Sequence, residues 1–125
     1  MQDRPDPAEI LAAVADFLRG EVLPALDGRL AFDLRVSIGA LELAGRQLAL
    51  APASDAAEAA RLDALLGPGG TLETGNRDLA AAIAEGRLGL DTPGLIDHLR
   101  RTAIEKLAVD QPRYAGLHRA LNQGA

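Results

Sequence analysis

Leucine and alanine dominate the apolar residues of this chain, and this bias constrains its fold more than any other feature. They supply forty-seven of its sixty apolar residues, while isoleucine and valine together supply nine. Leucine and alanine are strong helix formers, whereas β-branched and aromatic residues favour strands. The sequence therefore predicts an all-α protein.

The length of the chain fits one domain with one hydrophobic core. At 125 residues it lies near the usual domain size. We expect a single helical domain over residues 1–125, folded as an antiparallel bundle of four to five helices. Residues 1–6 are expected to form an extended N-terminal arm, and residues 115–125 a loose C-terminal tail.

The charge of the chain excludes several kinds of partner. Its formal net charge is -5, and an acidic chain has no general attraction for polyanions. Neither nucleic acid nor a membrane is therefore expected as a partner, and no apolar run approaches the about 18 residues of a membrane span. The polar opening at residues 1–5 predicts no secretory signal, and cysteine is absent. We expect a cytoplasmic protein.

Two segments that contain proline predict helix starts. Asp6 precedes Pro7 and lies three residues before Glu9, which is the pattern of a capping box with proline in the first turn. Asp91–Pro93 predicts a second start in the same way, and the helix behind it is expected to end near Pro112.

Residues 29–51 fit two patterns. Apolar residues alternate from Leu30 to Ile38, as in a strand, but a helical face also fits the segment. Two glycines weaken a helix by roughly 1 kcal/mol each, while no hairpin dipeptide divides the segment. We predict one long helix, with strands as the alternative. The residues of the helical face are Leu30, Leu34, Ile38, Leu41 and Leu48.

Proline and glycine divide the rest of the chain. Pro52 is expected to end the long helix, and a short helix is expected between it and Gly67–Gly70. Thr71 or Thr74 is expected to open the next helix, with Gly86 in its C-terminal turn.

No arrangement of side chains predicts catalysis, a metal site or a cofactor. His98 and His118 lack the spacing of paired metal ligands. The Gly67–Thr71 loop precedes a helix but lacks the lysine of a phosphate-binding loop. Neither Ser37 nor Ser54 has the surroundings of a catalytic nucleophile. We therefore predict no catalytic residue, no metal and no cofactor.

Six residues are candidates for contact with a ligand or a partner. Two lie near a helix start, where simpler residues would be expected, and two lie on a later helix, either as an anion-binding cluster or as ordinary polar surface. The other two combine arginine with the only tyrosine, a common contact anchor, although the tyrosine could equally cover the bundle end. The candidates are Asn76, Arg77, His98, Arg101, Arg113 and Tyr114.

Three stretches carry a resemblance to a known family. They are the opening MQDRPDPAEILAAVADFLRGEVLPAL, the patch Gly75-Asn76-Arg77 and the close KLAVDQPRY. The chain resembles a bacterial family described only as a domain of unknown function. The resemblance implies a helical protein, favours a helix at residues 29–51, and places leucine where this chain has Gly75. Members are typically encoded beside aminoglycoside-phosphotransferase-like kinases and acyl-CoA dehydrogenases.

These observations support three hypotheses of function. The first is a non-catalytic helical accessory protein that binds a phosphotransferase-like kinase or an acyl-CoA-metabolising enzyme, with residues 2–5 and Arg113–Tyr114 as contact surfaces. The second is a binder of acyl or phosphorylated metabolites, or a weak enzyme, which requires Asn76, Arg77, His98 and Arg101 to converge on one pocket. The third is a structural homodimer that buries surplus apolar surface against a second copy.

Overall fold

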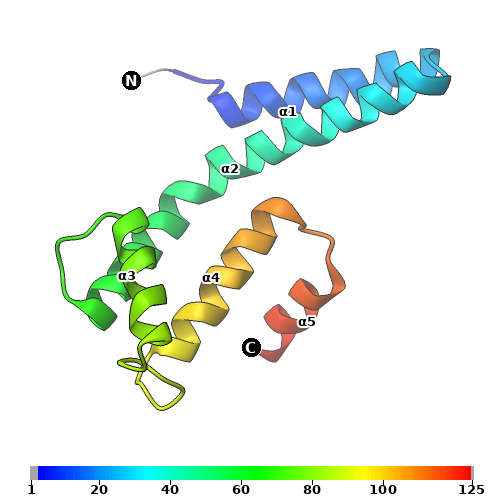
Figure 1. The fold of residues 1–125 in the computed structure, drawn as a ribbon. Coiled ribbons are helices and arrows are strands. Elements are labelled where there is room, and N and C mark those ends of the chain that lie inside the picture. The colour runs from blue at the N-terminus through cyan, green and yellow to red at the C-terminus, as the bar shows by residue number, and fades with distance from the viewer. Residues whose placement is uncertain (1–2, 125) are drawn as a thin grey trace. The chain divides into compact units, whose positions relative to one another are not determined.

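The computed structural model of the protein describes residues 3–124 (Figure 1). Across these residues it contains five α-helices and no strand. The all-α prediction is therefore confirmed, and residues 29–51 form the predicted helix and not the alternative strands. The chain divides between Ala51 and Pro52 into two compact units, which we call the N-terminal unit and the C-terminal unit.

Helix α1 (Pro7–Phe17) begins at the predicted capping box. The backbone N–H of Glu9 donates to Asp6 Oδ1 at 2.9 Å, and the Asp6 N–H donates to Glu9 Oε2 at 2.7 Å. These bonds satisfy two of the backbone donors that a helix start leaves free. The Asp6 N–H and the Arg4 guanidinium together hold the pKa of Glu9 below its usual value.

A distorted turn joins α1 to the next helix. A π-helical turn (η1, Leu18–Val22) leads into a 3₁₀ turn (η2, Leu23–Ala25). Pro24 has no backbone N–H and disfavours a regular helix, and the chain forms the 3₁₀ turn there. Gly28 then opens α2 with a φ of 58°, a backbone conformation that favours glycine. The two helices run side by side in opposite directions (Figure 1).

Helix α2 (Gly28–Leu66) is continuous, so the prediction that Pro52 ends it was wrong. A proline inside a helix removes one backbone hydrogen bond, and its ring crowds the preceding turn. The bond removed by Pro52 is the one that an N–H at this position would donate to the Leu48 carbonyl. Ala49, Ala51 and Ala53 surround Pro52, and the high helix propensity of alanine favours a helix on both sides of the proline. The helix therefore passes from one unit into the other.

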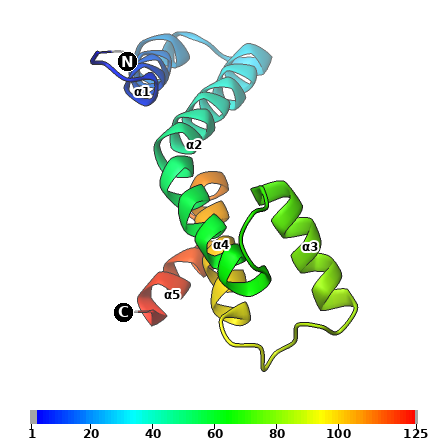
Figure 2. The ribbon, with the colours of Figure 1, turned by 90° about the vertical axis from the view of Figure 1, so that its left-hand side faces the viewer.

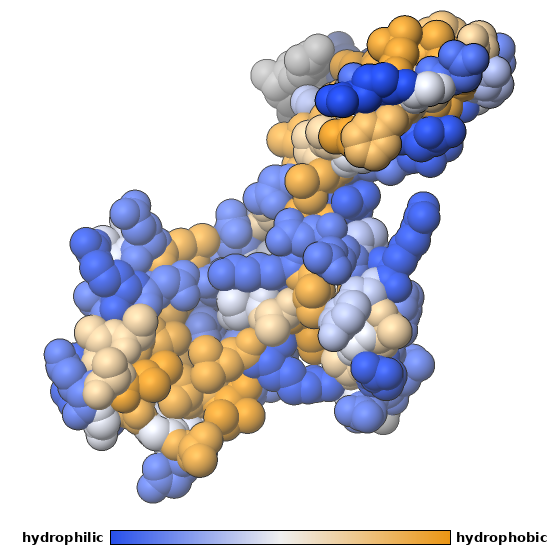
Figure 3. All heavy atoms as spheres, turned by 45° about the vertical axis from the view of Figure 1, so that its right-hand side comes forward, coloured by the Kyte–Doolittle hydropathy of each residue, from blue (hydrophilic) through white to orange (hydrophobic). Residues whose placement is uncertain are grey.

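The N-terminal unit buries few side chains. Among its described residues only Ala15, Ala31 and Ile38 are buried, and two of these are alanine. Many larger apolar side chains remain exposed on both of its helices, and Figure 3 shows them between hydrophilic residues on its surface. Two helices with so small a core are marginally stable by themselves.

The C-terminal unit packs the end of α2 against three further helices, α3 (Leu72–Ala84), α4 (Leu95–Asp110) and α5 (Ala115–Gln123) (Figure 2). Its core joins one leucine from each of α2, α3 and α4, with four partly buried leucines around them. The central leucines are Leu62, Leu79 and Leu95, and those around them are Leu65, Leu66, Leu72 and Leu88.

The two remaining helix starts differ in their outcome. Thr71, one of the two predicted starts, caps α3 and forms a reciprocal capping box with Thr74. Asp91–Pro93 does not start α4, because the Thr92 hydroxyl accepts the Gly89 N–H at 2.9 Å and is used in a turn instead. The helix begins at Leu95, directly after Gly94 with a φ of 85°.

The segment expected as a loose C-terminal tail is helical as far as the structure describes it. In α5, Leu117 is 3% exposed, and Arg100 of α4 donates to the Ala120 carbonyl at 2.6 Å. Burial of this apolar residue against α4 orders a segment that is too short to be helical alone. At the other terminus, residues 3–6 precede α1 without helix, and residues 1–2 of the expected arm lie outside the described residues.

Candidate functional site

Six polar side chains meet between the helices of the C-terminal unit, and we call them the polar cluster. Helix α2 contributes two of them, α3 one and α4 three. In the order of the chain they are Glu58, Arg61, Asn76, His98, Thr102 and Glu105.

Arg61 is the centre of the polar cluster. Its Nη2 donates to Glu105 Oε2 at 2.8 Å, and its Nη1 donates to Glu105 Oε1 at 3.2 Å. A guanidinium bound to a carboxylate through two parallel hydrogen bonds is a strong and well-oriented pair. Nη2 also donates to Thr102 Oγ1 at 3.4 Å, and Nε donates to His98 Nδ1 at 3.3 Å. One arginine of α2 thus binds three residues of α4.

Glu58 connects the polar cluster to α3. It is 8% exposed and accepts a hydrogen bond from Asn76 Nδ2 at 2.6 Å. The same Nδ2 donates to the Leu72 carbonyl at 2.9 Å, one turn earlier in α3. A buried carboxylate without partners would be costly, so Asn76 stabilises the packing of α3 on α2.

His98 is the most buried polar residue of the cluster, with 1% of its surface exposed. Its Nδ1 accepts the Arg61 Nε–H, which leaves the proton of the neutral ring on Nε2. Burial, followed by the charge of Arg61, lowers the pKa of His98, while Glu58, Glu105 and Asp97 oppose this shift. His98 is therefore a neutral acceptor in the folded protein near pH 7.

The members of the polar cluster are hydrogen-bonded to one another across three helices. Over residues 3–124, no buried side-chain nitrogen or oxygen lacks a hydrogen-bond partner. Within the polar cluster, hydrogen bonds join α2 to both α3 and α4. Its arrangement suits a structural role, in which it fixes α3 and α4 on α2.

The lowered pKa of His98 predicts a pH-dependent stability. In the window below the ordinary value of 6.5, the unfolded chain binds a proton at His98 that the folded chain does not. Stability therefore rises with pH there, and this contribution is lost as the pH falls from about 7 towards the folded-state pKa. Urea unfolding between about pH 5 and pH 8 measures it. We expect His98→Gln to flatten the curve; parallel curves for wild type and His98→Gln would contradict this.

The six predicted contact residues do not share one environment. Asn76 and His98 belong to the polar cluster, with Asn76 at its exposed edge, whereas Arg77 is exposed on α3 and lies outside the cluster. Arg101 is exposed and pairs with Asp97 one turn away, at 2.9 Å.

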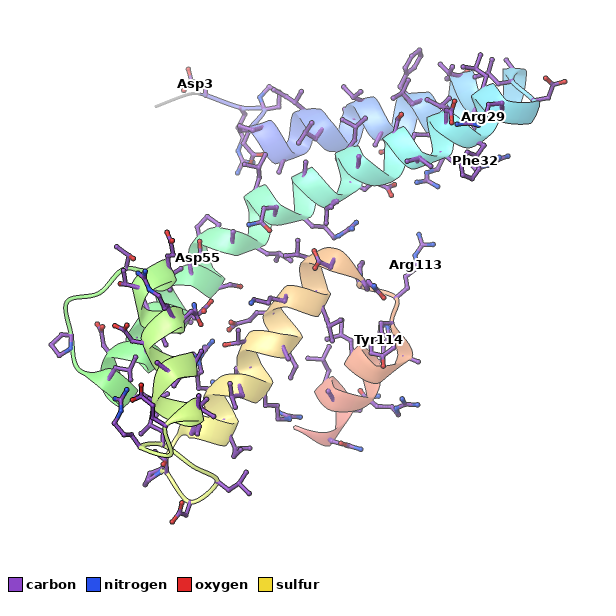
Figure 4. The ribbon with its side chains drawn as sticks, in the orientation of Figure 1. Asp3, Arg29, Phe32, Asp55, Arg113 and Tyr114 are labelled. Carbon is purple, nitrogen blue, oxygen red and sulfur yellow. The ribbon has the colours of Figure 1, made fainter. Side chains whose placement is uncertain are left out.

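The other two predicted contact residues lie just before α5. Arg113 is exposed, and Figure 4 shows its side chain extending away from the helix. Tyr114 is 49% exposed, and its ring lies over Gly116, where an added Cβ would come within 2.4 Å of the ring. Tyr114 therefore both covers the start of α5 and keeps half of its surface accessible.

Sequence reasoning did not single out Glu58, Arg61, Thr102 or Glu105. Acids and arginines at such spacings are usually solvated, and Glu105 lies one turn from Arg101 as well as opposite Arg61. The spacing along α4 alone does not distinguish these two partners.

A cavity of about 390 Å³ opens between the end of α2, the Gly67–Gly70 loop and the start of α3. Its charged lining residues are Asp63 and Asp78, and no arginine or lysine lines it. Two carboxylates disfavour a phosphate, so this loop is not suited to the phosphate binding that glycine-rich loops can provide.

Two further properties concern the described part of the chain as a whole. Within residues 3–124, no group of three or more acidic, histidine or cysteine side chains is arranged to hold a metal ion. None of the described helices combines the length and the apolar character needed to cross a membrane.

Helix α2 also presents an apolar stripe to solvent, which we call the outer stripe. Its members are spaced by four, seven and seven residues, so they share one side of the helix. They are exposed to 57%, 59%, 39% and 40%. The outer stripe consists of Phe32, Val36, Leu43 and Leu50.

The five helices of residues 3–124 define an all-α protein. The chain belongs to the DUF6285 family, a domain of unknown function, whose family model matches residues 24–114. This segment includes the close KLAVDQPRY and the whole polar cluster, whereas residues 1–23 of the opening lie outside it. No curated protein and no solved structure matches the chain.

Proposed function

We propose that the chain is a cytoplasmic, non-catalytic helical accessory protein that binds another protein through the outer stripe of α2. The observation that carries this proposal is the exposure of Phe32 and Val36, at 57% and 59%. Large apolar side chains grouped on one surface mark interaction sites more often than isolated ones do. The hydrogen bonds that join the polar cluster across α2, α3 and α4 support a role in structure instead of catalysis.

The outer stripe is separate from the surface that packs against α1. Ile38 and Ala31 are the residues of α2 buried in the N-terminal unit, and they lie on a different side of the helix. Figure 4 shows Phe32 on the side of α2 that faces away from α1. Helix α2 therefore has a second apolar side within this unit, which a partner helix or groove could cover.

Arginines border the outer stripe although the chain as a whole is acidic. Arg29 precedes Phe32 by three residues and also pairs with Asp33 at 2.9 Å, and Arg35 follows Phe32 by three residues. Residues three apart are neighbours on a helix surface. The matching partner is a protein with an apolar groove or helix face that carries carboxylates at its rim.

Two candidate partners come from the family resemblance, namely an aminoglycoside-phosphotransferase-like kinase and an acyl-CoA dehydrogenase. Titration calorimetry of the full chain with each purified enzyme tests them. We expect binding to one of the two, and a loss of affinity of about 30-fold or more in Phe32→Glu, as for an anchor residue worth about 2 kcal/mol.

Leu30→Glu is the matched control, because Leu30 is exposed to 61% on the same helix but lies on another side. It should leave the affinity for the partner within about threefold of wild type. Absence of binding to both enzymes would overturn the proposed partners. Equal affinities of Phe32→Glu and Leu30→Glu would overturn the outer stripe as the contact surface.

A further inference from the structure

The N-terminal unit exposes a second apolar surface, on both of its helices, which we call the hairpin face. On α1 its three residues follow one another at intervals of four and three positions in the sequence. On α2 the intervals between its three residues are eleven and seven positions, so on each helix the residues form one stripe. Five of the six are between 42% and 61% exposed, and Leu41 is half-buried. The hairpin face consists of Ile10, Val14, Phe17, Leu30, Leu41 and Leu48.

An ion pair shows that the two stripes lie on the same side of the hairpin. Arg19 Nη2 donates to Glu42 Oε1 at 2.6 Å, which bridges the two helices along one edge. On α1, Val14 lies on the opposite side from Arg19, with the buried Ala15 between them around the helix. On α2, Leu30 and Leu48 lie about 120° around the helix from Glu42, with the buried Ile38 between them. The stripes therefore share the side that faces away from the ion pair.

We propose that the hairpin face binds the hairpin face of a second copy of this chain, which forms a four-helix bundle from two N-terminal units. This inference is independent of the proposed function, because it uses a different side of α2. A two-fold axis parallel to the helices sets α1 of one copy against α2 of the other, in opposite directions. Every neighbouring pair in the bundle is then antiparallel, as in up-and-down bundles.

The register of the hairpin makes its face self-complementary. Gly45 lies beside Leu11, with a Cβ–Cβ distance of 3.8 Å for a Cβ placed on Gly45, and Arg19 lies beside Glu42. Rotation about a two-fold axis parallel to the helices leaves the position of each residue along that axis unchanged. Val14 of one copy therefore lies level with Leu41 of the second copy, and apolar residues meet apolar residues along the face.

The size of the hairpin face matches a minimal stable interface. With about half of each large side chain exposed, it presents about 500 Å² of apolar surface per copy, in the upper range for the largest patch on a monomer. Two copies would bury about 1,000 Å², which is the lower bound for a specific interface. Only three residues are buried among the described part of this unit, so a second copy supplies the core that the hairpin lacks.

Sedimentation equilibrium of the full chain over about 1–100 μM tests the proposal. We expect a mass of twice the 13.0 kDa of one chain, and a mass near one chain for the double variant Leu30→Glu/Leu48→Glu. Phe32→Glu introduces the same charge on the outer stripe and should remain dimeric. A wild-type monomer over the whole range would overturn the proposal, as would a dimer that survives Leu30→Glu/Leu48→Glu.

Cross-linking gives a second test that does not depend on the folding of the glutamate variants. The chain has no cysteine, so introduced thiols are the only ones. Val14→Cys chains mixed with Leu41→Cys chains should be joined by a short bismaleimide, because these positions are level across the two-fold axis. Val14→Cys mixed with Phe32→Cys should not be joined beyond the level of unmixed controls. Equal yields in the two mixtures would overturn the arrangement, whatever the result of partner binding.

Discussion

Arg61→Ala is expected to lower the free energy of unfolding by about 3 kcal/mol. The change removes every hydrogen bond from the guanidinium to Glu105, Thr102 and His98 at once. Removing one partner of a buried ion pair costs about 3–5 kcal/mol. The side chains of Arg61 and Glu105 are 16% and 24% exposed, which places this pair at the lower end. Urea unfolding followed by circular dichroism measures the loss.

Arg101→Ala is the matched control for Arg61→Ala. It breaks an arginine–carboxylate pair within α4, the helix that also carries Glu105. The side chains of Arg101 and Asp97 are 60% and 57% exposed. Such a pair contributes about 0.5 kcal/mol or less. Replacing both buried partners, Arg61→Met with Glu105→Leu, should recover part of the stability lost in Arg61→Ala. Equal losses for Arg61→Ala and Arg101→Ala would contradict the role of the polar cluster.

Gly75→Leu is expected to cost about 2 kcal/mol or more, although leucine is a better helix former than glycine. Gly75 is buried within α3, and a Cβ at this position would already lie 3.1 Å from Leu62 Cδ1. Three further carbon atoms would have to enter the leucine core between α2 and α3, and such overpacking typically costs 1–3 kcal/mol. Thermal or urea unfolding of the full chain provides the measurement.

Gly39→Leu is the control for this steric argument. Gly39 is also inside a helix, but nothing lies within 4 Å of a Cβ placed there. The variant should therefore gain up to about 1 kcal/mol from helix propensity alone. Gly75→Ala should fall between the two, since a similar gain is opposed by the close contact with Leu62. A Gly75→Leu protein as stable as wild type would show that the core can accommodate the side chain.

Local signals predicted most helix boundaries correctly. The Asp6–Glu9 and Thr71–Thr74 capping boxes and the Gly86 turn act within a few residues, so the local sequence suffices to place them. Pro52 shows where this reasoning fails. A proline lowers the stability of a helix but does not always end it, and the alanines around Pro52 favour helix on both sides. The α5 helix was missed because burial of Leu117 on α4, and not its own sequence, orders it.

The polar cluster as such was not predicted, although two of its members were predicted as contact residues. Asn76 was selected because simpler residues would be expected near a helix start, and His98 as part of an anion-binding cluster. Both have tertiary partners on α2. The sequence around Glu58 and Arg61 does not distinguish them from surface residues, because acids and arginines at these spacings are usually solvated. The resemblance that placed leucine at position 75 likewise could not reveal that glycine is needed for the close approach of Leu62.

The sequence by itself determined that this protein is built from helices, and where most of them begin, because helix propensity and capping depend on neighbours within one or two turns. Only the tertiary structure decided which polar residues are buried and which apolar residues stay exposed. Those properties depend on contacts between residues distant in the chain, such as Arg61 with Glu105 and Leu62 with Gly75. The side of α2 that carries Phe32 is exposed for the same reason, because α1 packs on another side of that helix.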